Sequence, residues 1–250
     1  MKHAFFAIVI LILLFSCSNQ EKKVFSSVTI TPVFNDSVSV RAIAPEDVNG
    51  VWFAANKGAV GLIDGTTPKI ATIRYQDSIL NFRAIARTKQ SVFVLSIESP
   101  AVLYKMNIEN KEAKDIKEVY VEEGEGVFYD AINFCNDTEG IAMGDPIGGG
   151  LSIIMTRDSG ETWQKLNCTK LPKTTKGEAA FAASNTNIAI QGDHTWIASG
   201  GKAARVFYSP DKGTSWEVFN TPIIQGDVMT GIYSVCLLYK YDASEEDDRK

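Results

Sequence analysis

Short apolar runs alternate with polar turns along most of the chain, and similar runs return at a regular interval. The run at residues 40–44 returns 42 residues later at 82–86, and related runs open at Tyr129, Gly177 and Gly231. After residue 24 the runs are short, rich in β-branched and aromatic residues, and without helical periodicity. The pattern therefore predicts an all-β chain made of repeats of about 40–50 residues.

Each repeat contains three clear apolar runs and a weaker fourth one. The second runs lie at residues 51–54, 92–95, 141–143 and 188–190. The turns between runs are rich in Asn, Asp and Gly, which favour turn conformations. Four strands in a repeat of this length is the period of a β-propeller blade. We expect blades over residues 24–235, followed by an irregular charged tail at 236–250.

The number of residues predicts an incomplete ring. At about 46 residues per blade, the chain holds about four and a half four-stranded blades. A fifth repeat opens at Gly231, but no further strand pattern follows it. Closed propellers remove exposed strand edges by joining the first blade to the last. We therefore expect a β-propeller that is truncated from a six- to eight-bladed ring.

Two repeats carry a sharper turn motif. Residues 156–163 and 209–216 both fit S/T-x-D-x-G-x-T/S-W. This motif resembles the Asp-box, or BNR repeat, of sialidase-like propellers, where it forms the hairpin between the third and fourth strands of a blade. Asp can accept bonds from turn amides, Gly can adopt positive φ, and Trp can pack between sheets. The resemblance implies structural roles for Asp158, Gly160, Trp163, Asp211, Gly213 and Trp216.

Two further stretches, residues 140–146 and 199–202, resemble bacterial BNR-propeller lipoproteins related to photosystem II assembly-factor-type propellers. Such proteins are often labelled as oxidoreductases. The three glycines at residues 148–150 do not open a helix within a βαβ unit, which a dinucleotide site requires. We therefore expect no cofactor and no oxidoreductase activity.

The N-terminus has the pattern of an export signal. A basic start at Lys2 and His3 precedes twelve apolar residues, which is too short for a membrane-spanning helix. Residues 14–17 (Leu-Phe-Ser-Cys) resemble the bacterial lipobox, in which the cysteine is lipidated. We expect a lipoprotein signal peptide at 1–16, a lipidated Cys17 and a tether to residue 23, and a protein anchored in the cell envelope, facing the periplasm or on the outer membrane. The alternative is an ordinary cleaved signal with an incidental cysteine.

Composition excludes several classes of partner. The net charge is −5, from 25 basic and 30 acidic residues, so the chain offers no broad basic face for nucleic acid. It has only two histidines, and its four cysteines lack the spacing of a zinc site, so we expect no metal centre.

The expected ligand site lies at the mouth of the central channel, on the face opposite the two turn motifs. We place there the starts of the innermost strands and the loops that join the second and third strands. These contribute seven candidate residues: Arg41, Arg83, Asp130, Asp145, Glu178, Asp193 and His194. Two arginines among carboxylates could bind a polar ligand or a peptide. The alternative is that these groups pair with one another or with water, that Asp145 and Asp193 shape turns, and that His194 is incidental.

Two functions compete. The first is a non-catalytic binding or assembly scaffold whose partner is a protein or glycan of the cell envelope, with the membrane contacted through the lipid. The second is a glycoside hydrolase, either sialidase-like or of the type that uses two carboxylates. Residues 81–85 (Asn-Phe-Arg-Ala-Ile) match only loosely the stretch that carries the first sialidase arginine, and no further arginines fall in matching places. The sequence therefore favours the scaffold and leaves its ligand open.

Overall fold

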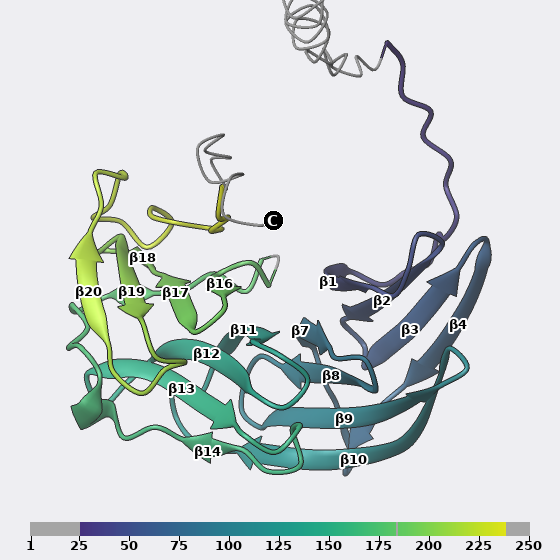
Figure 1. Ribbon diagram of the computed structural model, residues 1–250, viewed down its shortest axis with the longest axis horizontal. Coiled ribbons are helices and arrows are strands. Elements are labelled where there is room, and N and C mark those ends of the chain that lie inside the picture. Colours follow the sequence, from purple (N-terminus) through teal and green to yellow (C-terminus); the bar gives the residue numbers. More distant parts are fainter. Residues whose placement is uncertain (1–25, 184, 239–250) are drawn as a thin grey trace, which may run out of the picture. The chain divides into compact units, whose positions relative to one another are not determined.

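The computed structural model describes residues 26–183 and 185–238 (Figure 1). The chain divides into two units, Met1–Pro32 and Val33–Lys250. Residues 26–32 of the first unit carry no helix or strand, and every element below belongs to the second unit. The predicted signal peptide, Cys17, the tether and most of the predicted C-terminal tail lie outside the described residues.

Four four-stranded antiparallel sheets dominate the second unit, and in each the strands follow one another in chain order. We number these sheets as blades 1 to 4. Blade 1 contains β1 (Val40–Pro45), β2 (Gly50–Ala55), β3 (Ala59–Asp64) and β4 (Thr67–Thr72). Blade 2 contains β7 (Phe82–Arg87), β8 (Ser91–Ser96), β9 (Ala101–Glu109) and β10 (Glu112–Glu122). Blade 3 contains β11 (Tyr129–Phe134), β12 (Gly140–Ile147), β13 (Gly150–Thr156) and β14 (Gln164–Lys165). Blade 4 contains β16 (Ile188–Gln191), β17 (His194–Ala198), β19 (Arg205–Ser209) and β20 (Glu217–Asn220). The prediction of an all-β chain with four-stranded blades is confirmed.

The remaining elements are short. β5 (Arg74–Tyr75) pairs with β6 (Ser78–Ile79), and β15 (Glu178–Ala179) pairs with β18 (Gly200–Gly201). A 3₁₀ turn covers Cys168–Lys170. Within the residues described, no helix is long and apolar enough to cross a membrane.

The hydrophobic core consists of layers between successive blades, because each sheet buries side chains on both faces. The central strand β8 shows this directly. Val92 and Val94 pack toward blade 1, whereas Phe93 and Leu95 pack toward blade 3. Successive side chains of a strand point to opposite faces, so a strand that is buried on both sides reads as an unbroken apolar run. A third layer joins blade 3 to blade 4.

The prediction for the fourth repeat was wrong by one strand. Residues 177–181 do not form the innermost strand of blade 4, which is β16 instead. Only Glu178 and Ala179 of that run enter a ladder, in the small β15–β18 pair. As a result, Asp193 and His194 lie at the hairpin between the first and second strands of blade 4, not between the second and third. The backbone N–H of Lys212 donates to the Asp193 carbonyl (2.7 Å), so this hairpin lies beside the second turn motif and not opposite it.

Candidate functional site

The innermost strands of blades 1 to 3 share a backbone irregularity. The pairing of β1 with β2 shifts between Val40 and Ala42, and equivalent shifts occur on either side of Arg83 in β7 and Asp130 in β11. A β-bulge places one extra residue in a strand and turns its side chain in a new direction. Arg41, Arg83 and Asp130 therefore occupy equivalent positions in three blades, whereas Glu178 does not.

The side chains at two of these bulges, Arg41 and Arg83, line the same cavity. The cavity has a volume of about 320 Å³ and is lined by Arg41, Arg83 and Asp145, with apolar walls. Those walls are formed by Phe128, Ala180, Phe181, Ala182, Ala183, Met229 and Tyr233. We call this space the arginine cavity. Three of the seven residues predicted for a ligand site are thus brought together around it.

Aromatic stacking forms part of the apolar wall. The rings of Phe181 and Tyr233 stack with centroids 3.9 Å apart and planes 6° apart. Asp145 is held between two segments: its backbone N–H donates to the Phe128 carbonyl (2.9 Å), and its Oδ1 accepts from the Ala180 N–H (2.8 Å). These contacts fix the position of a carboxylate beside the aromatic pair.

The two arginines form no ion pair with the described acidic residues. Among the described residues, neither Arg41 nor Arg83 forms an ion pair, and the Nε of Arg83 is buried without a hydrogen-bond partner. A buried donor that lacks a partner destabilises the fold by about 1–3 kcal/mol. Both guanidinium side chains thus line the cavity without an ion-pair partner from the described residues.

Asp130 lies fully buried near the cavity but does not line it. Neither of its carboxylate oxygens has a hydrogen-bond partner in the part of the chain that the structure describes. Burial raises the pKa of the Asp130 carboxyl well above its usual range; the negative charge of Asp145 raises it further, and Arg83 opposes this rise. Burial also raises the pKa of Asp145, against the lowering effect of its hydrogen bond from Ala180. Two neighbouring carboxyl groups therefore have pKa values above that of an ordinary aspartate.

Glu178 has partners of its own and does not line the arginine cavity. It is buried, and its Oε1 accepts from Arg205 Nε (3.0 Å) and from Ser199 Oγ (2.6 Å). Its Oε2 accepts from Arg205 Nη2 and from the Thr175 N–H (2.8 Å). This arrangement ties the loop before β16 to β19.

Asp193 and His194 also lie apart from the arginine cavity. The Asp193 carboxylate pairs with Lys212 Nζ (3.3 Å). His194 Nδ1 is 2.5 Å from the Tyr208 hydroxyl, and its ring stacks near Trp196 with centroids 5.9 Å apart. Both residues therefore pack within blade 4 and its neighbouring turn.

The two turn motifs share one pattern of hydrogen bonds. In the first, Asp158 Oδ1 accepts from the Thr162 N–H (3.0 Å) and Asp158 Oδ2 from the Thr162 hydroxyl (2.6 Å). In the second, Asp211 accepts equivalent bonds from the Ser215 N–H (2.7 Å) and hydroxyl (2.6 Å). The bonds from Thr162 lower the pKa of Asp158 to about 2. Each motif closes the hairpin between the third and fourth strands of its blade.

The glycine and the tryptophan of each motif pack toward the preceding blade. Trp163 is buried against Phe93 and Phe134, with ring centroids 6.3 and 5.8 Å apart. Trp216 is half-buried against the core layer between blades 3 and 4. Gly160 and Gly213 have φ of +76° and +85°, a conformation that L side chains rarely adopt.

The sequence patterns did not reveal several residues that contact the innermost strands or line the arginine cavity. Asn185 accepts from the Ile132 N–H (2.9 Å), and its amide donates to the Ile85 carbonyl (2.7 Å), so one side chain connects β11, β7 and the loop before β16. The sequence marks this asparagine only as part of a turn. Phe181, Met229 and Tyr233 were also missed, because no periodic pattern shows that a loop residue faces a distant strand.

Within the described chain, no group of three or more His, Cys, Asp and Glu residues is arranged to hold a metal ion. No family model matches the sequence, and no curated protein matches it. The comparison with solved structures does find similar folds.

Three of these structures illustrate the likeness. The RRP9 WD40 repeats align with 11% identity over 75% of this chain and 53% of that chain, with a TM-score of 0.50. The GH74 xyloglucanase from Xanthomonas campestris aligns with 12% identity over 71% of this chain and 30% of that chain, also at 0.50. YCF48 bound to D1 peptide aligns with 11% identity over 72% of this chain and 82% of that chain, at 0.42.

The alignments establish fold and not activity. WD40 repeats build β-propellers, and this chain shares their arrangement of four-stranded sheets. The chain spans about half of the WD40 structure and less than a third of the xyloglucanase. We conclude that this chain has β-propeller architecture.

Proposed function

We propose that the protein is a non-catalytic binding scaffold of the bacterial cell envelope, exported and held at a membrane by lipid on Cys17. Its partner, a protein or glycan of the envelope, docks at the arginine cavity. The observation that carries this proposal is the pair of guanidinium groups, Arg41 and Arg83, that equivalent bulges bring to one cavity without acidic partners among the described residues.

The lining of the cavity suits a partner with an acidic group beside an apolar or aromatic one. Guanidinium groups bind carboxylates through charge-assisted, often bidentate hydrogen bonds. The stacked rings of Phe181 and Tyr233, together with Met229, offer apolar contact next to these charges. Aromatic side chains and arginine are enriched at the centres of protein interfaces.

The two turn motifs support the rigid-scaffold part of this proposal. We propose that they are Asp-boxes; what supports this is that both use an Asp side chain to accept turn hydrogen bonds and a Gly with positive φ, in the same hairpin of successive blades. Their hydrogen bonds and Trp contacts fix the outer hairpins against the preceding blades. A docking site on a rigid framework loses less conformational freedom on binding.

A pull-down with and without the two arginines tests the proposal. The full lipidated chain is cross-linked in intact envelopes as wild type, as the double variant Arg41→Gln/Arg83→Gln, and as Arg74→Gln. Arg74 is an exposed arginine that does not line the arginine cavity and serves as the matched control. We expect one partner to be recovered with wild type and the control but not with the double variant. Equal recovery with the double variant would contradict the proposal.

Membrane attachment is tested separately. Cys17→Ala removes the lipidation site and should move the exported protein from the membrane fraction to the soluble fraction. Retention of the variant in the membrane fraction would contradict the lipid anchor while leaving the cavity proposal in place.

A glycoside hydrolase is the second candidate, and the observation in its favour is the pair Asp130 and Asp145. Both carboxyl groups have raised pKa values, which a general acid needs. The complete burial of Asp130 counts against it, because a buried group cannot touch a sugar. Hydrolysis of aryl glycosides by wild type, lost in Asp130→Asn, would establish this candidate and overturn the scaffold.

A further inference from the structure

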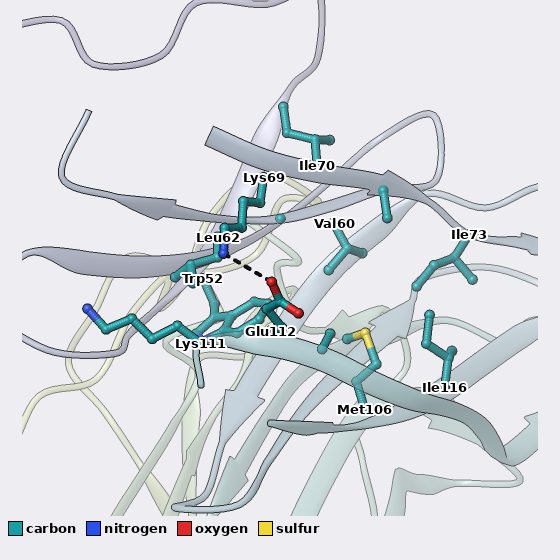
Figure 2. A pocket seen from close by; sticks show the side chains of 13 residues that line it. Trp52, Val60, Leu62, Lys69, Ile70, Ile73, Met106, Lys111, Glu112 and Ile116 are labelled. Atoms are coloured by element: carbon teal, nitrogen blue, oxygen red, sulfur yellow. Dashed lines mark ion pairs between the residues drawn. The ribbon is translucent and has the colours of Figure 1, made fainter. Parts of the chain in front are cut away.

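A second cavity lies between blade 1 and blade 2, away from the arginine cavity. It has a volume of about 240 Å³ and lies between β3 and β4 on one side and β9 and β10 on the other. Figure 2 shows Val60, Ile73 and Met106 gathered at this space, with Trp52 and Leu62 beside them. These five residues are buried members of the core layer between the two blades. We call this space the inter-blade cavity.

The interior of the inter-blade cavity is apolar. The one polar atom of Trp52, its Nε1, donates to Glu46 Oε2 (2.6 Å) and is therefore satisfied. Ile70 and Ile116 line the cavity and remain 43% and 50% exposed. Apolar cavities of about 150 Å³ stay dry and bind small apolar molecules. The apolar residues that line this cavity are suited to contact a hydrocarbon group.

Charged side chains occur among the lining residues. Lys69 on β4 pairs with Glu112 on β10, with Nζ and Oε1 3.5 Å apart and both side chains half-exposed (Figure 2). Lys111 is held by Asp47 (2.7 Å) and Asp64 (2.8 Å). The charge of Lys111 is thereby matched on the protein itself.

Lys69 is the cation that is free to change partner. Its single ion pair in the described chain is the long contact to Glu112, and Glu112 keeps a shorter pair with Lys114 (2.8 Å). A ligand carboxylate that replaces Glu112 at Lys69 leaves no charge unmatched. An exposed ion pair of this length is worth little, so this exchange costs little.

We propose that the inter-blade cavity binds the alkyl chain of an aliphatic carboxylate, whose carboxylate group pairs with Lys69. The apolar lining binds the alkyl chain of the ligand, and Lys69 binds its carboxylate group. The site does not depend on the arginine cavity, so it stands or falls separately from the proposed scaffold function.

Methyl NMR of Met106 tests this proposal, with decanoate as the probe. The protein is the full chain with Cys17→Ser, which removes the expected acylation site so that no attached lipid competes. We expect decanoate to shift the Met106 methyl signal and to leave that of Met229, which lines the arginine cavity, unchanged. An unshifted Met106 signal at saturating decanoate would overturn the proposal.

Variants that fill the cavity give the matched control. Ala113 on β10 and Ala71 on β4 line the cavity from opposite blades. Ala113→Leu should weaken decanoate binding at least tenfold, and Ala71→Leu should do the same if the first variant fails to fold. Unchanged affinity in a folded, filled variant would place the ligand elsewhere and refute the site.

The carboxylate part of the proposal has its own test. Lys69→Gln should weaken decanoate binding about two- to fivefold, the effect expected of one exposed charge pair, and leave decanol binding unchanged. Lys114→Gln should have no such effect. Equal binding of decanol and decanoate to wild type, with no effect of Lys69→Gln, would refute the role of Lys69.

Discussion

Substitution of Gly160 by alanine tests how the first turn motif packs against blade 2. A Cβ at Gly160 would lie 2.2 Å from Cε1 and 2.5 Å from Cζ of Phe93, well below the 3.0 Å that real Cβ contacts keep. Phe93 is fully buried and packs against Phe134 and Trp163, so its ring has no free space to move into. Overpacking of this kind destabilises by about 1–3 kcal/mol. The positive φ adds about 1–2 kcal/mol.

Gly65 provides a matched control in the corresponding hairpin of blade 1. Its φ is +60°, and an added Cβ would meet nothing within 4 Å. Gly65→Ala should therefore lower the free energy of unfolding by about 1–2 kcal/mol, which is the cost of the positive φ alone. Gly213→Ala should fall between the two, because the atoms it approaches belong to the flexible end of Met155.

Thermal and urea unfolding measure the stability of the three Gly→Ala variants. For a chain of this size, each 1 kcal/mol shifts the melting temperature by about 2–4 °C. We expect the loss of stability to rise from Gly65→Ala through Gly213→Ala to Gly160→Ala. Equal losses for Gly65→Ala and Gly160→Ala would refute the packing described for this motif.

Three further substitutions test buried and hydrogen-bonded charges. The raised pKa of Asp130 means that the folded state binds its proton more tightly than the unfolded state, so this group lowers stability as pH rises above about 4. Asp130→Asn should therefore stabilise the protein relative to wild type by an amount that grows as pH rises above about 4 in urea unfolding; a difference independent of pH would contradict this. Asp158 has a pKa lowered to about 2. The folding stability that its ionised carboxylate contributes is therefore present above pH 4 and lost as pH falls toward 2. Asp158→Ala should cost about 1–2 kcal/mol at pH 7, a discounted value because the turn is exposed, and almost nothing near pH 2. Glu178→Gln breaks the buried pair with Arg205 and should cost about 3–5 kcal/mol in the same assay, whereas a cost below 1 kcal/mol would show that the pair contributes little.

The sequence pattern predicted blades 1 to 3 well because the second and third strands of these blades are long and mostly buried, which produces clear apolar runs. β8 is buried at every position and reads as a short unbroken apolar run. The fourth repeat was misassigned because residues 177–181 and 188–190 are both short apolar runs next to turns. Residues 178–179 pair with residues 200–201 instead, and Glu178 forms a buried ion pair with Arg205; these tertiary contacts leave no periodic signal.

The sequence could predict the residues of the candidate site that recur in each repeat. It could not predict those that lie in loops. Arg41 and Arg83 could be aligned because the same bulge recurs at the same place in each blade. Phe181 and Tyr233 could not, because their stacking joins two irregular segments about fifty residues apart in the chain. Backbone conformation in such segments is set by distant contacts and not by local preference.

Site-specific photo-crosslinking from the wall of the arginine cavity tests whether Arg41 and Arg83 hold the partner there. A photoreactive residue replaces Met229, which lines the cavity and is 69% exposed, and a control replaces Ile79, which is exposed and lies in β6. We expect a discrete adduct from position 229, and not from position 79, in intact envelopes, and we expect Arg41→Gln/Arg83→Gln to abolish it. An adduct that persists in the double variant, or that forms equally from position 79, would contradict the claim that the two arginines hold the partner.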